Sequence, residues 1–306
     1  MSPLPTISSV LCLFQGESSE LNALDTAFGL ARRFGAILRV LHVSTPPMTV
    51  VDPFGAAAFA GALISTEVID RIVKDDDDMI TAARRYVLAY ALVHGVPVCL
   101  DEQQIAGAAG SAALFVTQED YTCHLVDLYG RKSDVIVAAG DDSHGLSDES
   151  RILPALLDTG KAVVLVPHQT SHRPPKPVGN VFRAERVAVA WDGSLQASRA
   201  LTNALPLLAD VKILHLLTVR ENGRMPQGTT QDAEAILRNH GITPLTMELN
   251  NARTATGESL LAAAAALNAD LLIMGAYGHN RIAERLLGGT SRYVLKHAPL
   301  SVLMTH

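Results

Sequence analysis

Four glycines and two hydroxyl residues follow an apolar run in the last quarter of the chain. The run 271–274 is followed by Gly275, Gly278, Gly288, Gly289, Thr290 and Ser291. A phosphate needs backbone N–H groups that no Cβ obstructs, preferably at the positive end of a helix, and glycines beside a helix start supply both. The spacing therefore predicts a phosphate-binding segment over 275–291.

Each of these glycines also has a purely structural explanation. Gly275 and Gly278 fit turn positions with positive φ, and Gly288 with Gly289 fits a helix C-cap. The number of glycines, and their place between a strand-like run and the helix pattern 291–296, favours phosphate binding.

Polar side chains near the glycines could neutralise a bound phosphate. His279 and Asn280 directly follow Gly278 and are the stronger candidates. Arg281 and Arg285 better fit the solvated face of a helix.

A second polar turn follows the short apolar run 187–190, where Trp191, Asp192 and Gly193 come in succession. The carboxylate of Asp192 is a good acceptor for ribose hydroxyls or an adenine amino group. The same side chain suits the N-cap of the helix that the next residues predict. Both roles stay open from the residues alone.

Short runs of Val, Ile and Leu alternate with helical patterns along the chain. In the second half the apolar runs are 187–190, 213–217, 271–274 and 301–304, and helical stripes cover 197–209 and 258–267. Runs that are apolar on both faces are typical of parallel strands covered by helices, and their alternation with helices predicts doubly wound α/β domains. Ligands bind such sheets beyond the carboxyl ends of the strands, where the strand order reverses. We therefore expect Asp192 and Gly275 at the same edge of one sheet.

Four strand-like segments recur in the same order, which indicates a tandem duplication. The pairs are 10–16 with 187–193, 39–43 with 212–216, 134–138 with 270–274, and 162–168 with 300–306. This alignment sets four histidines at strand ends, where packing or dimer contact is favoured over metal binding: His42, His168, His215 and His306. Prolines between the halves resist helix and sheet. The predicted domains are residues 1–168 and 186–306, joined by a linker over 169–185.

These segments resemble the universal stress protein family, specifically its tandem two-domain members. The resemblance rests on VAVAWDGS at 187–194, LLIMGAYGHNRIAERLLGGTS at 271–291 and the closing strand 300–306, and it covers the second half and, more faintly, the first. It implies two tandem doubly wound domains, each a mainly parallel five-stranded sheet with helices on both faces, of the Rossmann-like, adenine nucleotide alpha hydrolase-like type. In ATP-binding members the glycine motif ends in Ser or Thr. Here Gly289 takes that place, and Thr290 follows one residue later.

The resemblance implies an adenine-nucleotide site in the C-terminal domain. Asp192 would hold the adenosine part, and Val219, after the second strand, would border the adenine. Gly275, preceded in its strand by Met274, would lie under the ribose. The rest of the motif would surround the phosphates: Gly278, His279, Gly288, Gly289, Thr290 and Ser291. The implied ligand is ATP, ADP or AMP, with or without Mg²⁺, and the resemblance assigns no catalytic residue and no metal ligand.

The first half departs from this pattern. Gln15, Ala139 and Asp142 stand where the second half has Asp192, Gly275 and Gly278. Asp141 and Asp142 would repel phosphates, and no run of two glycines and a hydroxyl residue follows. The N-terminal domain is therefore predicted not to bind ATP in the same manner. Its insert, from Thr45 to about Asp78, ends in an acidic run that is most simply a solvated helix start, with divalent-ion binding as the alternative.

Composition limits the class of protein. A chain of 306 residues suffices for two domains that each bury a core, and 48% hydrophobic with 18% charged residues is typical of globular proteins. The net charge of -6 provides no general attraction for nucleic acid. The N-terminus does not read as a secretory signal and no window is apolar enough to span a bilayer, so a cytoplasmic location is expected. Three cysteines without zinc-site spacing are interpreted as reduced core thiols: Cys12, Cys99 and Cys123.

Three functions from different classes remain open. The preferred one is a cytoplasmic universal stress protein that binds an adenine nucleotide in its C-terminal domain and has a signalling or stress-protective role. The second is a slow ATPase or nucleotide hydrolase, although the sequence has no P-loop and no evident general base. The third is a nucleotide-independent dimeric scaffold. The terminal strands 163–166 and 302–304 end each half at a sheet edge, and such edges are usually paired or covered. The resemblance implies that these strands pair between domains or subunits, so the two halves are expected to pack as a pseudo-dimer, with a homodimer as a further option.

Overall fold

A computed structural model describes residues 6–44, 66–140, 149–168, 182–221, 230–251, 255–276 and 289–306. Its strands are β1 (Ser9–Leu13), β2 (Ile37–Ser44), β3 (Val98–Cys99), β4 (Ala112–Glu119), β5 (Val135–Ala139), β6 (Ala162–Val166), β7 (Arg186–Ala190), β8 (Ile213–Glu221), β9 (Leu245–Asn251), β10 (Leu271–Gly275) and β11 (Ser301–Thr305). Its helices are η1 (Ser18–Glu20), α1 (Leu21–Phe34), α4 (Thr66–His94), α5 (Glu102–Ala106), α6 (Thr122–Gly130), α7 (Glu149–Leu157), α8 (Leu195–Ala204), η2 (Leu205–Asp210), α9 (Thr230–Asn239), α10 (Thr256–Ala266) and α11 (Gly289–His297).

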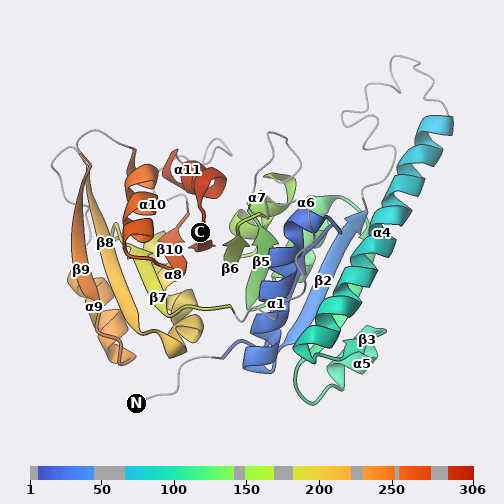
Figure 1. Ribbon diagram of the computed structural model, residues 1–306, viewed down its shortest axis with the longest axis horizontal. Helices are drawn as coiled ribbons and strands as arrows, with labels where there is room; N and C mark the ends of the chain where they lie inside the picture. Colours follow the sequence, from blue (N-terminus) through green and yellow to red (C-terminus); the bar gives the residue numbers. More distant parts are fainter. Residues whose placement is uncertain are drawn as a thin grey trace.

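The described strands form one sheet in the order β3-β4-β2-β1-β5-β6-β11-β10-β7-β8-β9 (Figure 1). We call β1 to β6 with their helices the N half, and β7 to β11 with theirs the C half. All strand pairs within each half are parallel. The predicted α/β architecture is confirmed, and the N half adds a sixth strand, the two-residue β3, to the five that were predicted.

The two halves meet where β6 pairs antiparallel with β11, with Val164 opposite Leu303. One apolar layer, under α1, α4, α8 and α9, runs across both halves on one face of the sheet. A second layer does the same under α6, α7, α10 and α11 on the other face. This pairing thus makes the two cores continuous, since apolar side chains of both halves pack against one another on each side of the joint.

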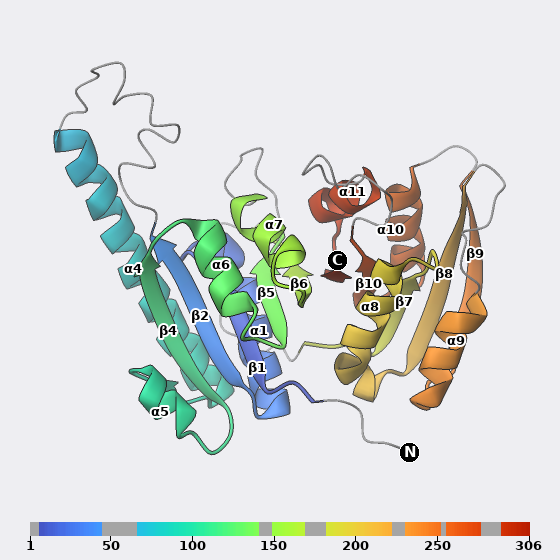
Figure 2. The same cartoon turned by 180° about the vertical axis from the view of Figure 1, so that it is seen from behind.

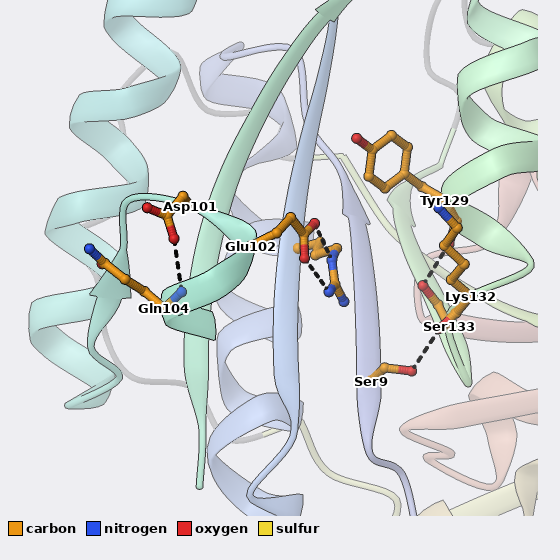
Figure 3. A network of polar contacts seen from close by, with 8 residues as sticks. Ser9, Asp101, Glu102, Gln104, Tyr129, Lys132 and Ser133 are labelled. Carbon is orange, nitrogen blue, oxygen red and sulfur yellow. Dashed lines mark hydrogen bonds and ion pairs between the residues drawn. The ribbon is translucent and has the colours of Figure 1, made fainter. Parts of the chain in front are cut away.

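Equivalent aspartates directly precede β5 and β10. Asp134 Oδ2 accepts the N–H of Ser9 at 2.9 Å, and Asp270 Oδ2 accepts the N–H of Arg186 at 3.2 Å. Both carboxylates thus fix the first strand of their half, an equivalence that agrees with the tandem duplication. Burial raises the pKa of Asp270, and these backbone donors oppose that rise. Ser9 also donates its Oγ hydrogen to the carbonyl of Lys132 at 3.3 Å (Figure 3).

Further polar contacts hold the N half together at the same amino end of its strands. Arg39 makes two hydrogen bonds to Glu102, at 2.9 and 2.7 Å, and Asp101 caps α5 by accepting the N–H of Gln104 at 2.8 Å (Figure 3). Because these contacts lie at the end of the sheet opposite to the predicted nucleotide site, we assign them a structural role.

The hydrogen bonds at the strand ends fix how the halves correspond. Phe14 N–H donates to the Leu41 carbonyl at 3.0 Å, and Trp191 N–H donates to the Leu217 carbonyl at 2.8 Å. Since Phe14 and Trp191 correspond, Leu41 corresponds to Leu217. The alignment of β2 with β8 drawn from the sequence is therefore wrong by three residues.

The histidine correspondence predicted from the sequence is wrong for the same reason. An odd shift turns a strand over, so His42 and His215 point to opposite faces of the sheet. At the closing strands, Ala139 pairs with Val166 and Gly275 pairs with Thr305, so His306 corresponds to Pro167 and not to His168.

Helix α4 differs strongly from its counterpart in the C half, α9. It has 29 residues against 10 in α9, and it extends past the ends of β2 and β4 (Figures 1 and 2). The acidic run 75–78 lies inside this helix and not at its start, because the helix begins at Thr66. The rest of the insert, residues 45–65, lies outside the described residues. None of the described helices combines the length and apolar character that crossing a membrane requires.

The cysteines are free but differ in burial. Cys12 is fully buried, and burial raises the pKa of its thiol, whereas Cys99 is half-buried and Cys123 is exposed. The interpretation as core thiols is therefore right for Cys12 and wrong for Cys123. Of the predicted linker, residues 169–181 lie outside the described residues, and Phe182 and Ala184 are buried in the core.

Candidate functional site

The carboxyl ends of β7 and β10 are neighbours at the point where the strand order of the C half reverses. These strands pair in parallel with Leu272 opposite Ala188 and Ile273 opposite Val189. The turn that begins at Trp191 therefore emerges beside the end of β10. The prediction that Asp192 and Gly275 share one sheet edge is confirmed. This reversal is the place where open α/β sheets bind ligands.

Asp192 forms a turn with the start of α8. Its Oδ1 accepts the N–H of Ser194 at 2.9 Å, and Ser194 Oγ accepts the N–H of Ala197 at 3.1 Å. Ser194 is thus the N-cap of α8, and the alternative that Asp192 caps the helix directly is wrong. Within the described residues Asp192 Oδ2 has no hydrogen bond, and the side chain is half-buried. One oxygen therefore fixes the turn while the other remains available to a ligand.

Gly275 is required by packing and not by a turn. It ends β10 and does not have a positive φ. A Cβ atom added to it would lie 2.6 Å from the backbone N of Ala197 and 2.7 Å from the carbonyl carbon of Gln196. Only glycine lets the first turn of α8 approach the strand so closely. Sequence reasoning missed this contact, because nothing local to Gly275 shows which helix crosses it. The preceding Met274 is buried in the core, at 4% exposure.

Val219 lies two residues beyond the last contact between β7 and β8. The carbonyl of Leu217 accepts a hydrogen bond from Trp191, so the backbone groups of Leu217 face β7. Alternate residues of a parallel strand face the same neighbour, so the N–H and C=O of Val219 also face that side. Strand β7 ends at Ala190, which leaves these two groups beside the turn of Asp192. The Val219 side chain is buried at 7% exposure.

The first turn of α11 brings the last three predicted residues to the carboxyl edge of the sheet. Gly289 is exposed, and a Cβ there would meet none of the described residues within 4 Å. Thr290 is half-buried and Ser291 is buried at 4% exposure. Gly257 of α10 packs against α11, since its Cβ would lie 3.0 Å from the Tyr293 side chain. A helix start that neighbouring elements hold firmly presents its N–H groups as an anion site.

The remaining predicted site residues lie outside the described residues: Gly278, His279, Asn280, Arg281, Arg285 and Gly288. Asp141 and Asp142 of the N half also lie outside them. Among the described side chains, the acidic run of α4 included, no group of three or more His, Cys, Asp or Glu is arranged to hold a metal ion.

The comparisons with known proteins agree with this geometry. Residues 184–306 match the model of the universal stress protein family. Universal stress protein Slr1230 of Synechocystis is 34% identical over 123 residues, which are 39% of this chain and 41% of that protein. The C-terminal part of this chain belongs to the universal stress protein family. The match thus spans less than half the length of that curated relative.

Two solved structures share the fold of the whole chain. A universal stress protein from Archaeoglobus fulgidus superposes with a TM-score of 0.62 at 18% identity, covering 97% of each chain. A putative universal stress protein from Pseudomonas aeruginosa has a TM-score of 0.54 at 13% identity, covering 98% of this chain and 93% of that one. The fold of universal stress proteins therefore extends over both halves, as expected of a tandem member.

Proposed function

We propose that this universal stress protein binds an adenine nucleotide in its C half, at the reversal between β7 and β10. The observation that carries the proposal is that Asp192, the glycine end of β10 and the start of α11 share one sheet edge. A nucleotide needs a hydroxyl acceptor at one end and N–H donors at the other, and this edge offers both.

The proposed pose follows from these positions. The free Oδ2 of Asp192 accepts ribose hydroxyls, and the N–H and C=O of Val219 face the adenine edge. The first turn of α11, with Gly289 and Thr290, receives phosphate oxygens together with the motif glycine at 278. The ligand is ATP, ADP or AMP, and Mg²⁺ bound through the phosphates would neutralise part of their charge.

The cellular role belongs to the same proposal. The protein acts in the cytoplasm in signalling or stress protection, and nucleotide occupancy changes its conformation or its partners. It is organised as domains 1–168 and 186–306, with the antiparallel β6–β11 pairing supporting an intramolecular pseudo-dimer. We propose at most slow hydrolysis of the nucleotide, since binding alone accounts for the residues at this edge.

The test is the nucleotide-dependent rise in melting temperature. A ligand at a hundred times its Kd stabilises a folded protein by about 2.7 kcal/mol. Gly289→Asp should abolish that rise, because the new carboxylate lies where phosphates would bind. The unliganded variant should keep its stability, since none of the described residues obstructs a side chain there and an acidic side chain is favourable at a helix N-terminus.

Gly289→Ala is the matched control and should retain most of the rise. A Gly289→Asp variant that still responds fully to ATP, ADP and AMP would refute the assigned phosphate position. No response from the wild-type protein to any of the three, together with no nucleotide released from freshly purified protein in mass spectrometry, would refute nucleotide binding itself.

A further inference from the structure

The N half has an edge that corresponds to the proposed nucleotide site of the C half. There the protein's own side chains make contacts like those proposed for the nucleotide. Leu41 corresponds to Leu217, so Val43 corresponds to Val219, two residues further along. Gln15 follows Phe14 as Asp192 follows Trp191. The two halves can therefore be compared group by group.

The carboxamide of Gln15 binds both backbone groups of Val43. Its Nε2 donates to the Val43 carbonyl at 3.2 Å, and its Oε1 accepts the Val43 N–H at 3.3 Å. A donor beside an acceptor is also what an adenine presents through its amino group and the neighbouring ring nitrogen. The Gln15 side chain thus makes the pair of hydrogen bonds that an adenine edge would make at this strand end.

A buried ion pair lies at the same edge of the N half. Glu20 Oε2 accepts the N–H of Gln15 at 2.7 Å, and its Oε1 binds Arg151 Nη1 at 2.7 Å. Glu20 is 2% exposed and the Arg151 side chain 14%. Arg151 is the third residue of α7, as Ser291 is of α11. The pair therefore joins the turn after β1 to the start of the helix that follows β5. In the C half, the proposed nucleotide would lie between the equivalent turn after β7 and the start of α11.

Helix α4 packs against the same turn. Gly16 has a φ of +93°, and a Cβ added there would lie 2.8 Å from the carbonyl oxygen of Met79. The ring of Tyr86 meets that of Phe14 edge-on, with centroids 6.3 Å apart. The long helix of the insert thus holds the turn that carries Gln15 against the sheet.

We propose that the N half is a self-occupied copy of the nucleotide site. The Gln15 carboxamide takes the place of adenine at Val43, and the Glu20–Arg151 pair takes the place of the ribose and phosphates. The functional consequence, one nucleotide per chain, rests on the proposed function. The contact of Gln15 with Val43 does not rest on the proposed function, and it is tested without any ligand.

The ligand-free test is amide hydrogen exchange at Val43. Gln15→Met keeps the length of the side chain but removes both hydrogen bonds, so the Val43 amide should exchange on the order of tenfold faster. Gln15→Glu keeps the acceptor, loses the donor and adds a charge next to Glu20, and it should lower the melting temperature. Gln103→Met, at an exposed glutamine of α5, is the control and should change neither quantity.

The ligand test counts nucleotides by equilibrium dialysis with labelled ATP. The wild-type protein should bind one equivalent. Asp192→Asn, which replaces the carboxylate of the C half by a carboxamide like that of Gln15, should bind none. Unchanged Val43 exchange in Gln15→Met would overturn the proposal that the N half is a self-occupied copy of the site, and two equivalents bound by the wild type would overturn it as well. No binding by the wild type would instead refute the proposed function, and Val43 exchange would then decide the occupancy of the N half alone.

Discussion

Replacing Gly275 by alanine should destabilise the C half, even though the change adds a single methyl group. The added Cβ would lie 2.6 Å from Ala197 N and 2.7 Å from the carbonyl carbon of Gln196. Carbon atoms in proteins sit about 3.5–4.0 Å from their non-bonded neighbours, so one partner must move by roughly 1 Å. Both contacted atoms belong to the backbone of α8, which cannot rotate away as a side chain could.

The magnitude follows from the cost of overpacking. Extra methylenes in a well-packed interior cost about 1–3 kcal/mol. At roughly 2–4 °C per kcal/mol, the conversion for proteins of about 150–250 residues, the melting temperature should fall by about 2–12 °C. The nucleotide response should weaken too, because a displaced α8 moves Ser194 and with it the turn that orients Asp192.

The assay uses the single tryptophan of the chain. Trp191 is 4% exposed and precedes Asp192, so its fluorescence reports unfolding of the C half at the site itself. Urea titrations of Gly275→Ala should show a lower midpoint than those of the wild type. The free energy of unfolding of Gly289→Ala should stay within about 0.5 kcal/mol of the wild-type value. If Gly275→Ala is as stable as the wild type, the packing argument is refuted. If it is stable but no longer binds nucleotide, the glycine serves the ligand and not α8.

Three further predictions concern caps and buried charges. Ser194→Ala should lower stability by about 0.5–2 kcal/mol, because α8 loses its N-cap; an unchanged urea midpoint would contradict the assignment. His42, 1% exposed, has its pKa lowered by burial against the opposing pull of Asp76, so the unfolded state binds more protons below about pH 6.5 and stability should fall as the pH drops through that range. His42→Thr should flatten this loss between about pH 7.5 and 5.5, whereas His124→Gln, at an exposed histidine, should leave it intact. Arg151→Met should cost about 3–5 kcal/mol at neutral pH by stranding the buried Glu20 carboxylate, and Glu20→Gln in the same chain should recover much of it; equal stability of single and double variants would argue against a working ion pair.

The sequence predicted those parts of the candidate site that depend on neighbours along the chain. Asp192 and Gly275 each follow an apolar run directly, and the rule for parallel sheets then brings their turns to one edge. The same local signals divided the chain into two halves of like strand order. They failed for the acidic run of α4, because a helix of 29 residues begins well before the charges that were expected to start it.

The alignment of β2 with β8 shows that sequence patterns did not predict the register of these strands. Both strands carry Leu-His, and matching those letters set the strands three residues apart from their hydrogen-bonded register. The residues of a short apolar strand remain mostly apolar when its alignment is shifted by a few positions, so composition alone does not determine the register. The backbone contacts with β1 and β7 decide it instead.

The sequence by itself determined the repeat, the alternation of strands and helices, and the place of Asp192 and Gly275, because these follow from local propensity and turn chemistry. Only the tertiary structure decided why residue 275 is glycine, which residue caps α8, and that Gln15 occupies the edge of Val43. Each of these depends on a close approach between different segments of the chain. The distance between two such segments is set by how they pack, and not by the residues next to them in the sequence.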